Sequence, residues 1–334
     1  MKILIAGGAG FIGSTIASAA LDRGDQVVIV DNLVTGRAEF CAGRTFYCGD
    51  IADGALLDRV FAEHPDIDAV IHCAALIVVP ESVDRPIHYY RENVAKTLEF
   101  VDSLTRNGCR RLLFSSSASI YATNADFTVD EDSPLQPLSP YARTKVMVEQ
   151  LLADVAAASE LRVLSLRYFN PIGADPRLRT GLQIKSPSHA LGKLIEAHAQ
   201  HVPFRITGTD YPTRDGSGIR DYIHVWDLAR AHLQALDRFD QVIERAGEPH
   251  TAINLGTGSG TTVRELVAAF NEVVDEPVAV ETAPPRPGDS AGAYTRSSRA
   301  ADELDWRAEL PLQQGIRDTL NWFAHRPEVL PDLA

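Results

Sequence analysis

The chain has 334 residues, and its 32 basic and 45 acidic side chains give a formal net charge of −13 at pH 7. This acidic balance argues against duplex nucleic acid as a partner, because proteins that bind it normally carry a basic face. The composition, with 45% hydrophobic and 23% charged residues, excludes disordered, collagen-like and coiled-coil chains.

The cysteines and the apolar stretches exclude further classes of protein. Cys41, Cys48, Cys73 and Cys109 show no CxxC spacing, so we expect neither a disulfide framework nor a metal site. Free thiols in a reducing cytoplasm are the simpler interpretation. The longest apolar stretch, at 69–80, is far shorter than the ~20 residues of a membrane span. We therefore expect a cytoplasmic protein without a membrane partner.

Short apolar runs alternate with helical segments along the first half of the chain. Buried parallel strands are expected at 2–6, 26–30, 68–73, 111–115 and 162–166. Helices are expected at 11–23, 91–105 and 141–158. This alternation predicts an α/β fold, a doubly wound parallel sheet of the Rossmann type with helices on both faces. The N-terminal run is interpreted as a strand and not as a signal peptide, because a glycine loop and a second strand follow it.

Beyond residue 170 the pattern loosens, which predicts a smaller α/β lobe. Helices are expected at 190–201, 225–236 and 263–274, with strands at 204–207 and 253–255. We expect residues 1–170 to form the first domain, with segments at about 219–255 returning to it, and residues 171–334 to form the C-terminal lobe.

A glycine-rich loop lies between the first strand and the first helix. Gly7, Gly10 and Gly13 permit a tight turn and let the backbone approach a pyrophosphate at the helix N-terminus. Asp31 ends the next strand, 18 residues after Gly13, where its carboxylate can bind ribose hydroxyls and would repel a 2′-phosphate. Together these features favour NAD over NADP as the cofactor. Asp50, which follows another short strand, is a candidate contact for the adenine.

A second group of residues indicates proton transfer. Tyr141 and Lys145 lie four residues apart at the start of a predicted helix, so their side chains share one face. Ser117 ends a strand, at the carboxyl edge where open α/β sheets bind ligands. A tyrosine that acts as a base at neutral pH needs its pKa lowered by roughly 3 units, or ~4 kcal/mol. One ammonium at ~4 Å supplies about that much at an effective dielectric constant of ~20.

Longer motifs are spread over almost the whole chain. They are GGAGFIGS at 7–14, PESVDRP at 80–86, SSSASIYA at 115–122, SPYARTK at 139–145, LRYFNPIGA at 166–174, YPTRDGSGIRDYIHV at 211–225, NLGTGSG at 254–260, RPGD at 286–289 and LDWRAEL at 304–310. On these motifs the chain resembles the extended short-chain dehydrogenase/reductases, and more closely the UDP-glucose (UDP-galactose) 4-epimerases. The motifs are specific for nucleotide-sugar epimerases and less specific for the sugar.

The resemblance implies an enzyme that inverts C4 of a UDP-hexose through a transient 4-keto sugar, with a tightly held NAD. Tyr141 would take the proton of the 4-hydroxyl, Lys145 would lower the pKa of Tyr141, and Ser117 would bridge to the 4-oxygen. The implied cofactor contacts are Gly7, Gly10, Phe11, Ile12, Gly13, Asp31, Asn32, Asp50, Ile51, Ala74, Ala75, Asn93, Ser115 and Tyr168. The implied substrate contacts are Ser119, Asn170, His189, Arg220, Arg286 and Ala293.

Two of these implications have simpler alternatives. Arg220 and Arg286 would bind the pyrophosphate, to which the guanidinium fork is suited, but each could pair instead with the aspartate in its own motif. The helices expected at 91–105 and 141–158 would form a homodimer interface, as in the family. A helix face that is buried within one chain would show the same pattern.

Several positions depart from the family's pattern. Ile77 stands where the family usually has a lysine on the cofactor, and Thr207 where many members have an aromatic residue near the base. His189 replaces an asparagine, and is either a phosphate contact or an ordinary residue at a helix N-terminus. Ala293, next to Tyr294, aligns with a position that is bulky in glucose-restricted members. A small side chain there leaves room beside the sugar C2 and implies tolerance of 2-acetamido sugars.

Three other functions remain open. A UDP-glucuronate 4-epimerase would share the same catalytic residues. A nucleotide-sugar 4,6-dehydratase would need an acid–base pair where this chain has Ala118 and Ser119. A non-catalytic NAD-binding protein would have no need of Ser117, Tyr141 and Lys145 together.

Overall fold

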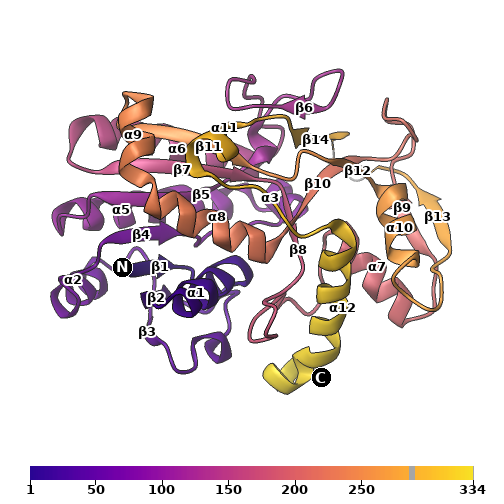
Figure 1. Cartoon of the computed structure of the whole chain (residues 1–334), viewed down its shortest axis with the longest axis horizontal. Coiled ribbons are helices and arrows are strands. Elements are labelled where there is room, and N and C mark those ends of the chain that lie inside the picture. Colours follow the sequence, from indigo (N-terminus) through magenta and orange to yellow (C-terminus); the bar gives the residue numbers. More distant parts are fainter. Residues whose placement is uncertain (286–289, 334) are drawn as a thin grey trace.

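The larger part of the molecule is built on a parallel sheet; the computed structural model describes residues 1–285 and 290–333. Within the described residues this sheet has seven strands, in the order β11-β7-β5-β4-β1-β2-β3 (Figure 1). They are β1 (Lys2–Ala6), β2 (Gln26–Asp31), β3 (Thr45–Cys48), β4 (Ala69–His72), β5 (Arg111–Ser117), β7 (Arg162–Tyr168) and β11 (His250–Leu255). Each adjacent pair is parallel, so the carboxyl ends of the strands lie along one edge.

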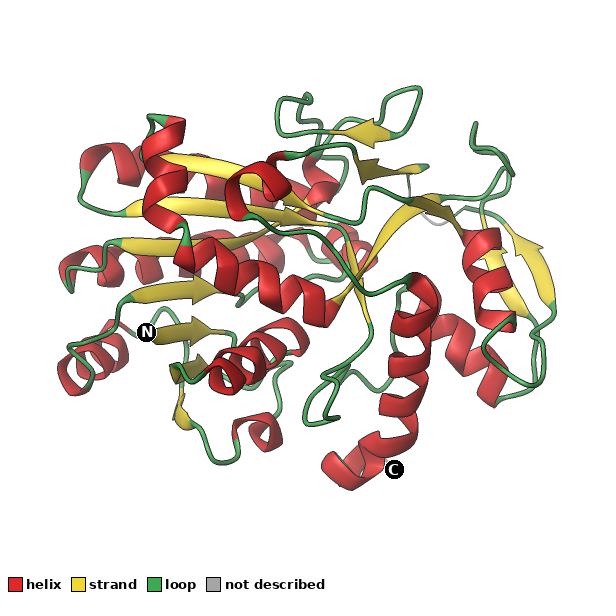
Figure 2. Ribbon diagram, viewed as in Figure 1, coloured by secondary structure: helices red, strands yellow, loops and turns green. Residues whose placement is uncertain are grey.

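Helices cover both faces of this sheet, as Figure 2 shows. One face carries α1 (Phe11–Arg23), α8 (Val225–Asp237), α9 (Phe239–Ala246) and α11 (Arg299–Leu304). The other carries α2 (Gly54–Glu63), α5 (Lys96–Arg106) and α6 (Pro140–Ala158). Because side chains alternate along a strand, Ile3 and Ile5 enter the first core while Leu4 and Ala6 enter the second. The expected Rossmann-type doubly wound sheet is confirmed.

A second lobe lies beyond the carboxyl edge of the sheet (Figure 1). Its strands are β6 (Thr128–Val129), β8 (Asn170–Ile172), β9 (Phe204–Thr207), β10 (Ile219–His224), β12 (Gly260–Thr262), β13 (Val280–Ala283) and β14 (Gly292–Thr295). Its helices include α7 (Ala190–Ala199), α10 (Val263–Asn271) and α12 (Leu312–Val329). Leu194, Phe204, Phe270 and Ile316 belong to a separate core that these helices share with the strands. The lobe is thus an α/β unit with its own hydrophobic interior.

The chain crosses more than once between the sheet and the second lobe. β10 pairs with β8, β12 and β14 in the lobe, but α8, which follows it directly, packs on α1. β11 then completes the central sheet beside β7. The end of β10 therefore connects the two parts of the molecule directly.

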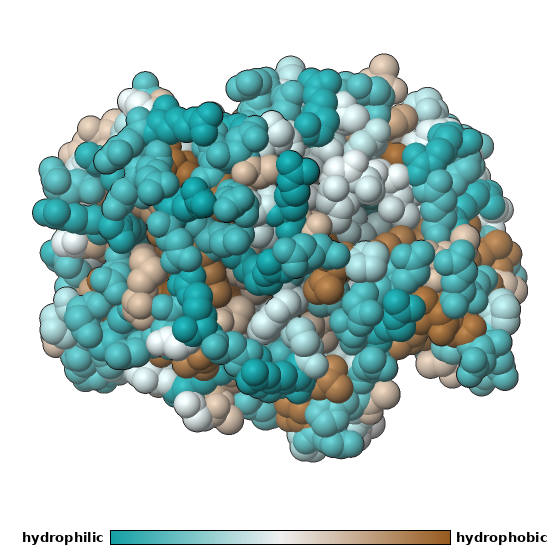
Figure 3. Space-filling model, viewed as in Figure 1, coloured by the Kyte–Doolittle hydropathy of each residue, from teal (hydrophilic) through white to brown (hydrophobic). Residues whose placement is uncertain are grey.

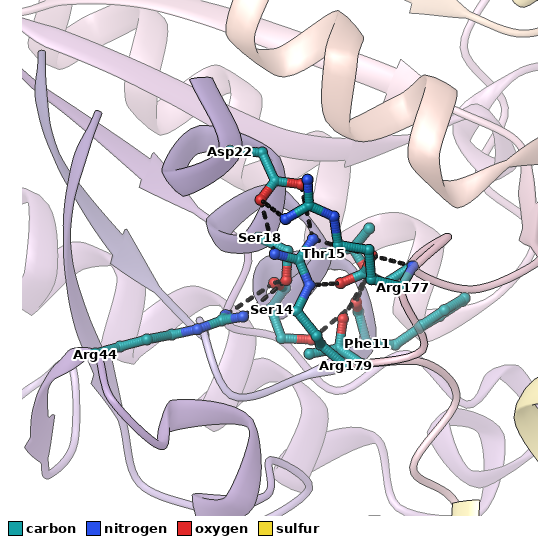
Figure 4. Close-up of polar contacts among 10 residues, drawn as sticks. Phe11, Ser14, Thr15, Ser18, Asp22, Arg44, Arg177 and Arg179 are labelled. Carbon is teal, nitrogen blue, oxygen red and sulfur yellow. Dashed lines mark hydrogen bonds and ion pairs between the residues drawn. The ribbon is translucent and has the colours of Figure 1, made fainter. Parts of the chain in front are cut away.

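A polar network joins α1 to the loop that follows β8 (Figure 4). The Arg179 guanidinium donates to both carboxylate oxygens of Asp22, at 2.8 and 2.9 Å, and its Nε lies 2.5 Å from Asp175 Oδ2. Asp175 is fully buried, and Arg177 adds a 3.0 Å bond to Asp22. On the other side Arg44 donates to two serines of α1. The network fixes the loop, and the second lobe with it, to the back of α1.

The face of the molecule in Figure 3 is mostly hydrophilic, with smaller hydrophobic patches toward the second lobe. Among the described residues, no helix has the length and apolar character that are needed to cross a bilayer.

Candidate active site

The glycine loop lies at the carboxyl edge of β1 and is packed as tightly as its sequence suggested. Gly7 has a φ of +79°, and a Cβ on it would lie 2.6 Å from the backbone nitrogen of Ala74. A Cβ on Gly13 would lie 2.3 Å from the carbonyl oxygen of Gly7. Gly10 is the N-cap of α1 and provides no side-chain cap, so the first-turn N–H groups remain available to an anion. These features fit a dinucleotide pyrophosphate.

Asp31 lies beside this loop, at the end of β2. The residue is only 7% exposed. Its two carboxylate oxygens accept hydrogen bonds from the backbone N–H groups of Ala9 and Leu33, at 3.0 and 2.8 Å. Burial raises its pKa, and these two bonds act in the opposite direction. A Cβ on Gly36 would lie 2.6 Å from Asp31 Oδ1, so the loop passes closely over the carboxylate. Each carboxylate oxygen can accept one more hydrogen bond, and a ribose hydroxyl could donate it.

Asp50 and Asn32 lie together at the outer end of the site. Asn32 donates to Asp50 Oδ2 at 2.9 Å, and Lys96 Nζ lies 2.6 Å from the same oxygen and 2.6 Å from Glu92. Burial raises the pKa of Asp50, but the bonds from Lys96 and its neighbours outweigh it, and the pKa is lowered overall. Sequence reasoning missed Lys96, which is distant from Asp50 along the chain. Ile51, next to Asp50, is buried in the second core.

Tyr141, Lys145 and Ser117 converge at the ends of α6 and β5. Tyr141 and Lys145 are 9% and 5% exposed, and the side chain of Ser139 caps the start of α6. Lys145 Nζ lies 2.7 Å from the carbonyl oxygen of Ser115 and 6.0 Å from the centroid of the Tyr141 ring. Ser117 donates to Ser119 Oγ at 2.9 Å, so Ser119 lies directly behind it.

Burial governs the protonation of this group. It raises the pKa of Tyr141, and a hydrogen bond between Tyr141 and Ser117 lowers that pKa in part. It also lowers the pKa of Lys145 to about 8. The phenol is therefore neutral at pH 7. To act as a base it needs a further positive charge, such as that of an oxidised nicotinamide.

The predicted neighbours of the nicotinamide lie around the same edge. Tyr168 ends β7, in register with Ser117, and its ring contacts His232 at 6.1 Å between centroids. Ala74 and Ala75 follow β4, where Ala74 meets the glycine loop.

Asn93 lies in a π-helical segment, Arg91–Ala95, which forms the start of the helix expected at 91–105 and is followed directly by α5. Its side-chain oxygen accepts from Leu76 N at 2.8 Å, and its Nδ2 donates to Leu76 O at 2.9 Å and to Thr144 at 3.1 Å. Single-turn π-bulges occur often at functional sites. Here the Asn93 amide connects the loop after β4, which contains Leu76, to Thr144 on α6.

Two other predicted cofactor residues enter the cores. The side chain of Phe11 packs with Phe40 and Trp322, and that of Ile12 packs with the core under α1. Only their backbones, at the start of α1, are left for a pyrophosphate. Ile77, the position without the family's lysine, is 56% exposed and adds no charge to the site.

Arg220 lies on β10, at the junction with the second lobe. Its guanidinium donates to the carbonyl oxygens of Ile219, Ala291 and Ser290, at 2.7, 2.8 and 3.2 Å. It has no carboxylate partner in residues 1–285 and 290–333. Asp221 bonds instead to the N–H groups and hydroxyl of the 257–258 turn, so the alternative ion pair is not formed. Arg286, the second predicted arginine, lies outside the described residues.

Two further predicted substrate residues take different positions. Asn170 begins β8, paired with Tyr222 of β10. The side chain of His189 caps α7, with Gly192 N–H donating to its Nδ1 at 3.1 Å. Burial lowers the pKa of His189 to about 4, so the ring is neutral. This contact matches the ordinary role at a helix N-terminus, and leaves Nε2 as a donor.

Ala293 lies on the side of β14 that faces the serine loop. It pairs with Arg220 in register and packs in one cluster with Ala118 and Phe169. Its neighbour Tyr294 packs in a different cluster, with Phe127 and other residues away from the serines. Ala293, and not Tyr294, therefore packs against the cluster that contains Ala118, the residue after Ser117.

Comparison with known proteins places the chain in a family. The sequence profile of the NAD dependent epimerase/dehydratase family matches residues 3–256. The chain belongs to this family. It is 40% identical to the UDP-glucose 4-epimerase of Erwinia amylovora over 343 residues, which cover 98% of this chain and 99% of that protein. The epimerase/dehydratase resemblance predicted from the motifs is confirmed.

Solved structures of family members superpose over nearly the whole chain. The UDP-glucose 4-epimerase from Bifidobacterium longum, in complex with NAD+ and UDP, gives a TM-score of 0.91 at 35% identity, covering 99% of this chain and 100% of that one. The UDP-Glc/GlcNAc 4-epimerase from Campylobacter jejuni gives 0.79 at 33% identity, covering 96% and 98%. The structural similarity to these family members therefore extends over both the central sheet and the second lobe.

Proposed function

We propose that the chain is an NAD-dependent 4-epimerase of UDP-hexoses, of the UDP-glucose and UDP-galactose type. The observation that carries the proposal is the convergence of Tyr141, Lys145 and Ser117 beside a glycine loop and Asp31. The near full-length likeness to proteins named UDP-glucose 4-epimerase supports it.

NAD fits the residues at the edge of the sheet. The glycine loop and the start of α1 would hold its pyrophosphate, Asp31 its adenosine ribose, and Asp50 with Asn32 its adenine end. Bound NAD would supply a hydride acceptor and donor and a positive charge. The position of Asp31 favours NAD over NADP, because a 2′-phosphate would meet a buried carboxylate.

The chain's own residues would handle the proton. Tyr141 would accept the proton of the sugar 4-hydroxyl as hydride leaves C4, and would return it when hydride is returned to the opposite face. Ser117 would bond the same oxygen, and the Lys145 ammonium would favour the phenolate. Between the two transfers the 4-keto sugar has to turn over, so the grip on the nucleotide must be firm and that on the sugar loose.

Arg220 is suited to bind the pyrophosphate of the nucleotide. Its guanidinium is held by three carbonyl oxygens and lies where the second lobe meets the sheet. Asn170 and His189 Nε2–H are further donors on the lobe side. Arg286 would add a second guanidinium. This role is inferred only from the RPGD motif at 286–289.

The size of Ala293 favours a second class of substrate, the 2-acetamido UDP-hexoses UDP-GlcNAc and UDP-GalNAc. Its side chain lies beside Ala118 in the cluster that borders the serine loop. One of the similar structures is named a UDP-Glc/GlcNAc 4-epimerase. A UDP-glucuronate 4-epimerase is a remaining alternative. A 4,6-dehydratase is disfavoured because Ala118 and Ser119 occupy the positions of its acid–base pair.

The deciding experiment incubates the purified protein with UDP-galactose, UDP-GalNAc or UDP-glucuronate, without added NAD, and follows products by NMR. We expect UDP-galactose to be converted to UDP-glucose, and UDP-GalNAc to UDP-GlcNAc. Tyr141→Phe should abolish turnover while the bound NAD remains. Conversion of UDP-glucuronate alone would favour the alternative, and no conversion of any of the three would reject the proposed substrates.

We also infer a homodimer in the cytoplasm. Large apolar side chains are exposed on four neighbouring helices, with 43% of Val83 on α3 (Val79–Asp84), 71% of Ile87 on α4 (Pro86–Tyr90), 49% of Leu98 on α5 and 43% of Met147 on α6. Exposed apolar surface of this kind suits a protein partner. The cysteines are free thiols, which suits a reducing compartment. Light scattering of the wild type and of Leu98→Glu tests the dimer; a wild-type monomer would reject it.

A further inference from the structure

A buried ion pair lies directly behind the predicted catalytic side chains. On α6, Glu149 follows Lys145 by four residues and Tyr141 by eight, so the three share one helix face. The side chains of Glu149 and Arg167 are only 6% and 9% exposed. Arg167 Nη2 lies 2.6 Å from Glu149 Oε2 and its Nε lies 3.0 Å from Oε1. Burying two charges is costly, and removing one partner leaves the other uncompensated.

The partners of Glu149 immediately precede the residues that are expected at the reacting atoms. Its carboxylate also accepts a hydrogen bond from Ser116 on β5, and Arg167 lies on the adjacent strand β7. In the sheet Ser116 pairs with Arg167, and the next pair is Ser117 with Tyr168. Glu149 therefore attaches α6 to both strands one residue before they enter the site.

We propose that Glu149 is a positioning residue for Tyr141 and Lys145, and that Arg167 cancels its charge so that it does not oppose the field of Lys145 at the phenol. The proposal rests on the proposed function, in which Tyr141 is the base. In this proposal the Glu149–Arg167 ion pair has two roles. The pair fixes the distance from α6 to Ser117, and it keeps the net charge behind Lys145 at zero.

Seven other titratable side chains lie around the pair and the catalytic group, and six of them add no charge to this balance. They are Tyr89, Tyr121, Tyr168, His72, His250, Cys73 and Glu131. Burial raises the pKa of the tyrosines and of the thiol and lowers that of the histidines, so all six are neutral near pH 7. Glu131 accepts a hydrogen bond from the backbone N–H of Asn254.

Replacing Glu149 with glutamine would upset the balance in a defined direction. The variant keeps the shape of the side chain but leaves the Arg167 guanidinium, which cannot lose its proton, without its counter-charge. At 1.5 Å per residue, Glu149 is about 12 Å along the helix from Tyr141 and about 6 Å from Lys145. Loss of a negative charge at these distances lowers the pKa of both groups. For Tyr141 the expected shift is on the order of one pH unit.

The test compares the wild-type holoenzyme with E149Q, with E149M/R167M and with E99Q, a matched change of an exposed glutamate on α5. The ultraviolet absorbance of phenolate is titrated in each protein with and without Y141F, so that the difference reports Tyr141 alone. We expect the titration to move to lower pH in E149Q and to return to the wild-type position in E149M/R167M and E99Q. We also expect kcat to fall by about tenfold in E149M/R167M with an unchanged KM, because α6 is no longer fixed to the strands.

An unchanged Tyr141 titration in E149Q, or a wild-type kcat in E149M/R167M, would overturn the proposal. The titration does not depend on turnover, so a wild type that fails to epimerise rejects the proposed function and still leaves the charge balance measurable. If E149Q does not fold, S116A replaces it, because it keeps both charges and removes one attachment to β5. We then expect a lower kcat with an unchanged titration, and a wild-type kcat would reject the positioning role.

Discussion

The Lys145 ammonium donates to the carbonyl oxygen of Ser115 at 2.7 Å. It makes no ion pair within the described residues, so its charge is held by a dipole and not neutralised by a carboxylate. This attachment places the cation against the strand that carries Ser117. It also makes the state of the site depend on a lysine whose pKa burial lowers to about 8.

The first prediction concerns pH. We expect kcat to fall as the pH rises through about 8, because Lys145 then loses the proton whose charge stabilises the Tyr141 phenolate. Lys145→Met should lower kcat by about 100-fold or more and remove this alkaline limb. The measurement is the pH–rate profile of both proteins, with Lys193→Met, an exposed lysine on α7, as the control. A persistent alkaline limb in Lys145→Met would assign it to another group.

The second prediction concerns the glycine loop. Gly7→Ala should abolish NAD binding, because the new Cβ would lie 2.6 Å from the backbone of Ala74 and displace the loop. Gly24→Ala is the matched control. Gly24 also has a positive φ, +92°, but no atom lies within 4 Å of its Cβ position. It should lose about 1 kcal/mol of stability and keep its NAD. The NAD content of the purified proteins, measured after denaturation, separates the two effects.

The third prediction concerns the choice of dinucleotide. Asp31→Asn removes the buried negative charge and keeps one acceptor oxygen, so one of the two bonds from the Ala9 and Leu33 N–H groups remains. We expect the NAD/NADP affinity ratio to fall by about tenfold or more, since the 2′-phosphate no longer meets a carboxylate. Calorimetric titration of the cofactor-free protein measures it, with the exposed Asp66→Asn as the control. An unaltered ratio would mean that Asp31 serves only to hold the loop.

The fourth prediction concerns the sugar. Ala293→Tyr should lower kcat/KM for UDP-GalNAc by roughly 100-fold while that for UDP-galactose changes by about threefold or less, because only the former needs room at C2. Tyr294→Ala is the control, since that side chain packs in a different cluster. Equal losses on both substrates would contradict the specificity role.

The fifth prediction concerns stability. Arg179→Met should lower the free energy of unfolding by about 2 kcal/mol, because the fully buried Asp175 loses its cation and Asp22 loses its bidentate partner. Arg177→Met, at a side chain that is 68% exposed, should change it by about 0.5 kcal/mol or less. Urea denaturation of both variants provides the comparison. Equal effects would mean that burial of Asp175 is not what gives the network its strength.

Much of the site could be predicted because its chemistry is local in sequence. The spacing of Gly7, Gly10 and Gly13 after an apolar run, and of Tyr141 and Lys145 on one helix, fixes geometry within a few residues. Much of the sheet followed for the same reason, since strands such as β1 and β2 contain short apolar runs.

The features that escaped prediction depend on pairs that are distant along the chain. Lys96 meets Asp50, and Glu149 meets Arg167, only after folding brings two elements together. Glu149 did carry one signal, as an acidic residue on the buried face of α6 one turn beyond Lys145. The π-helical turn at Asn93 has no such signal, because its extra residue is accommodated by packing against α6 and the loop after β4.

The burial of Tyr141, Lys145 and Glu149 on one face of α6 restricts how this segment of the sequence can change. A single-residue insertion between Tyr141 and Glu149 would rotate everything after it by about 100° around the helix axis, and would turn Glu149 toward solvent. Substitutions on the opposite face, at the exposed Arg143 and Gln150, leave that alignment intact. The segment should therefore tolerate changes of residue at these outward positions and reject any change of length.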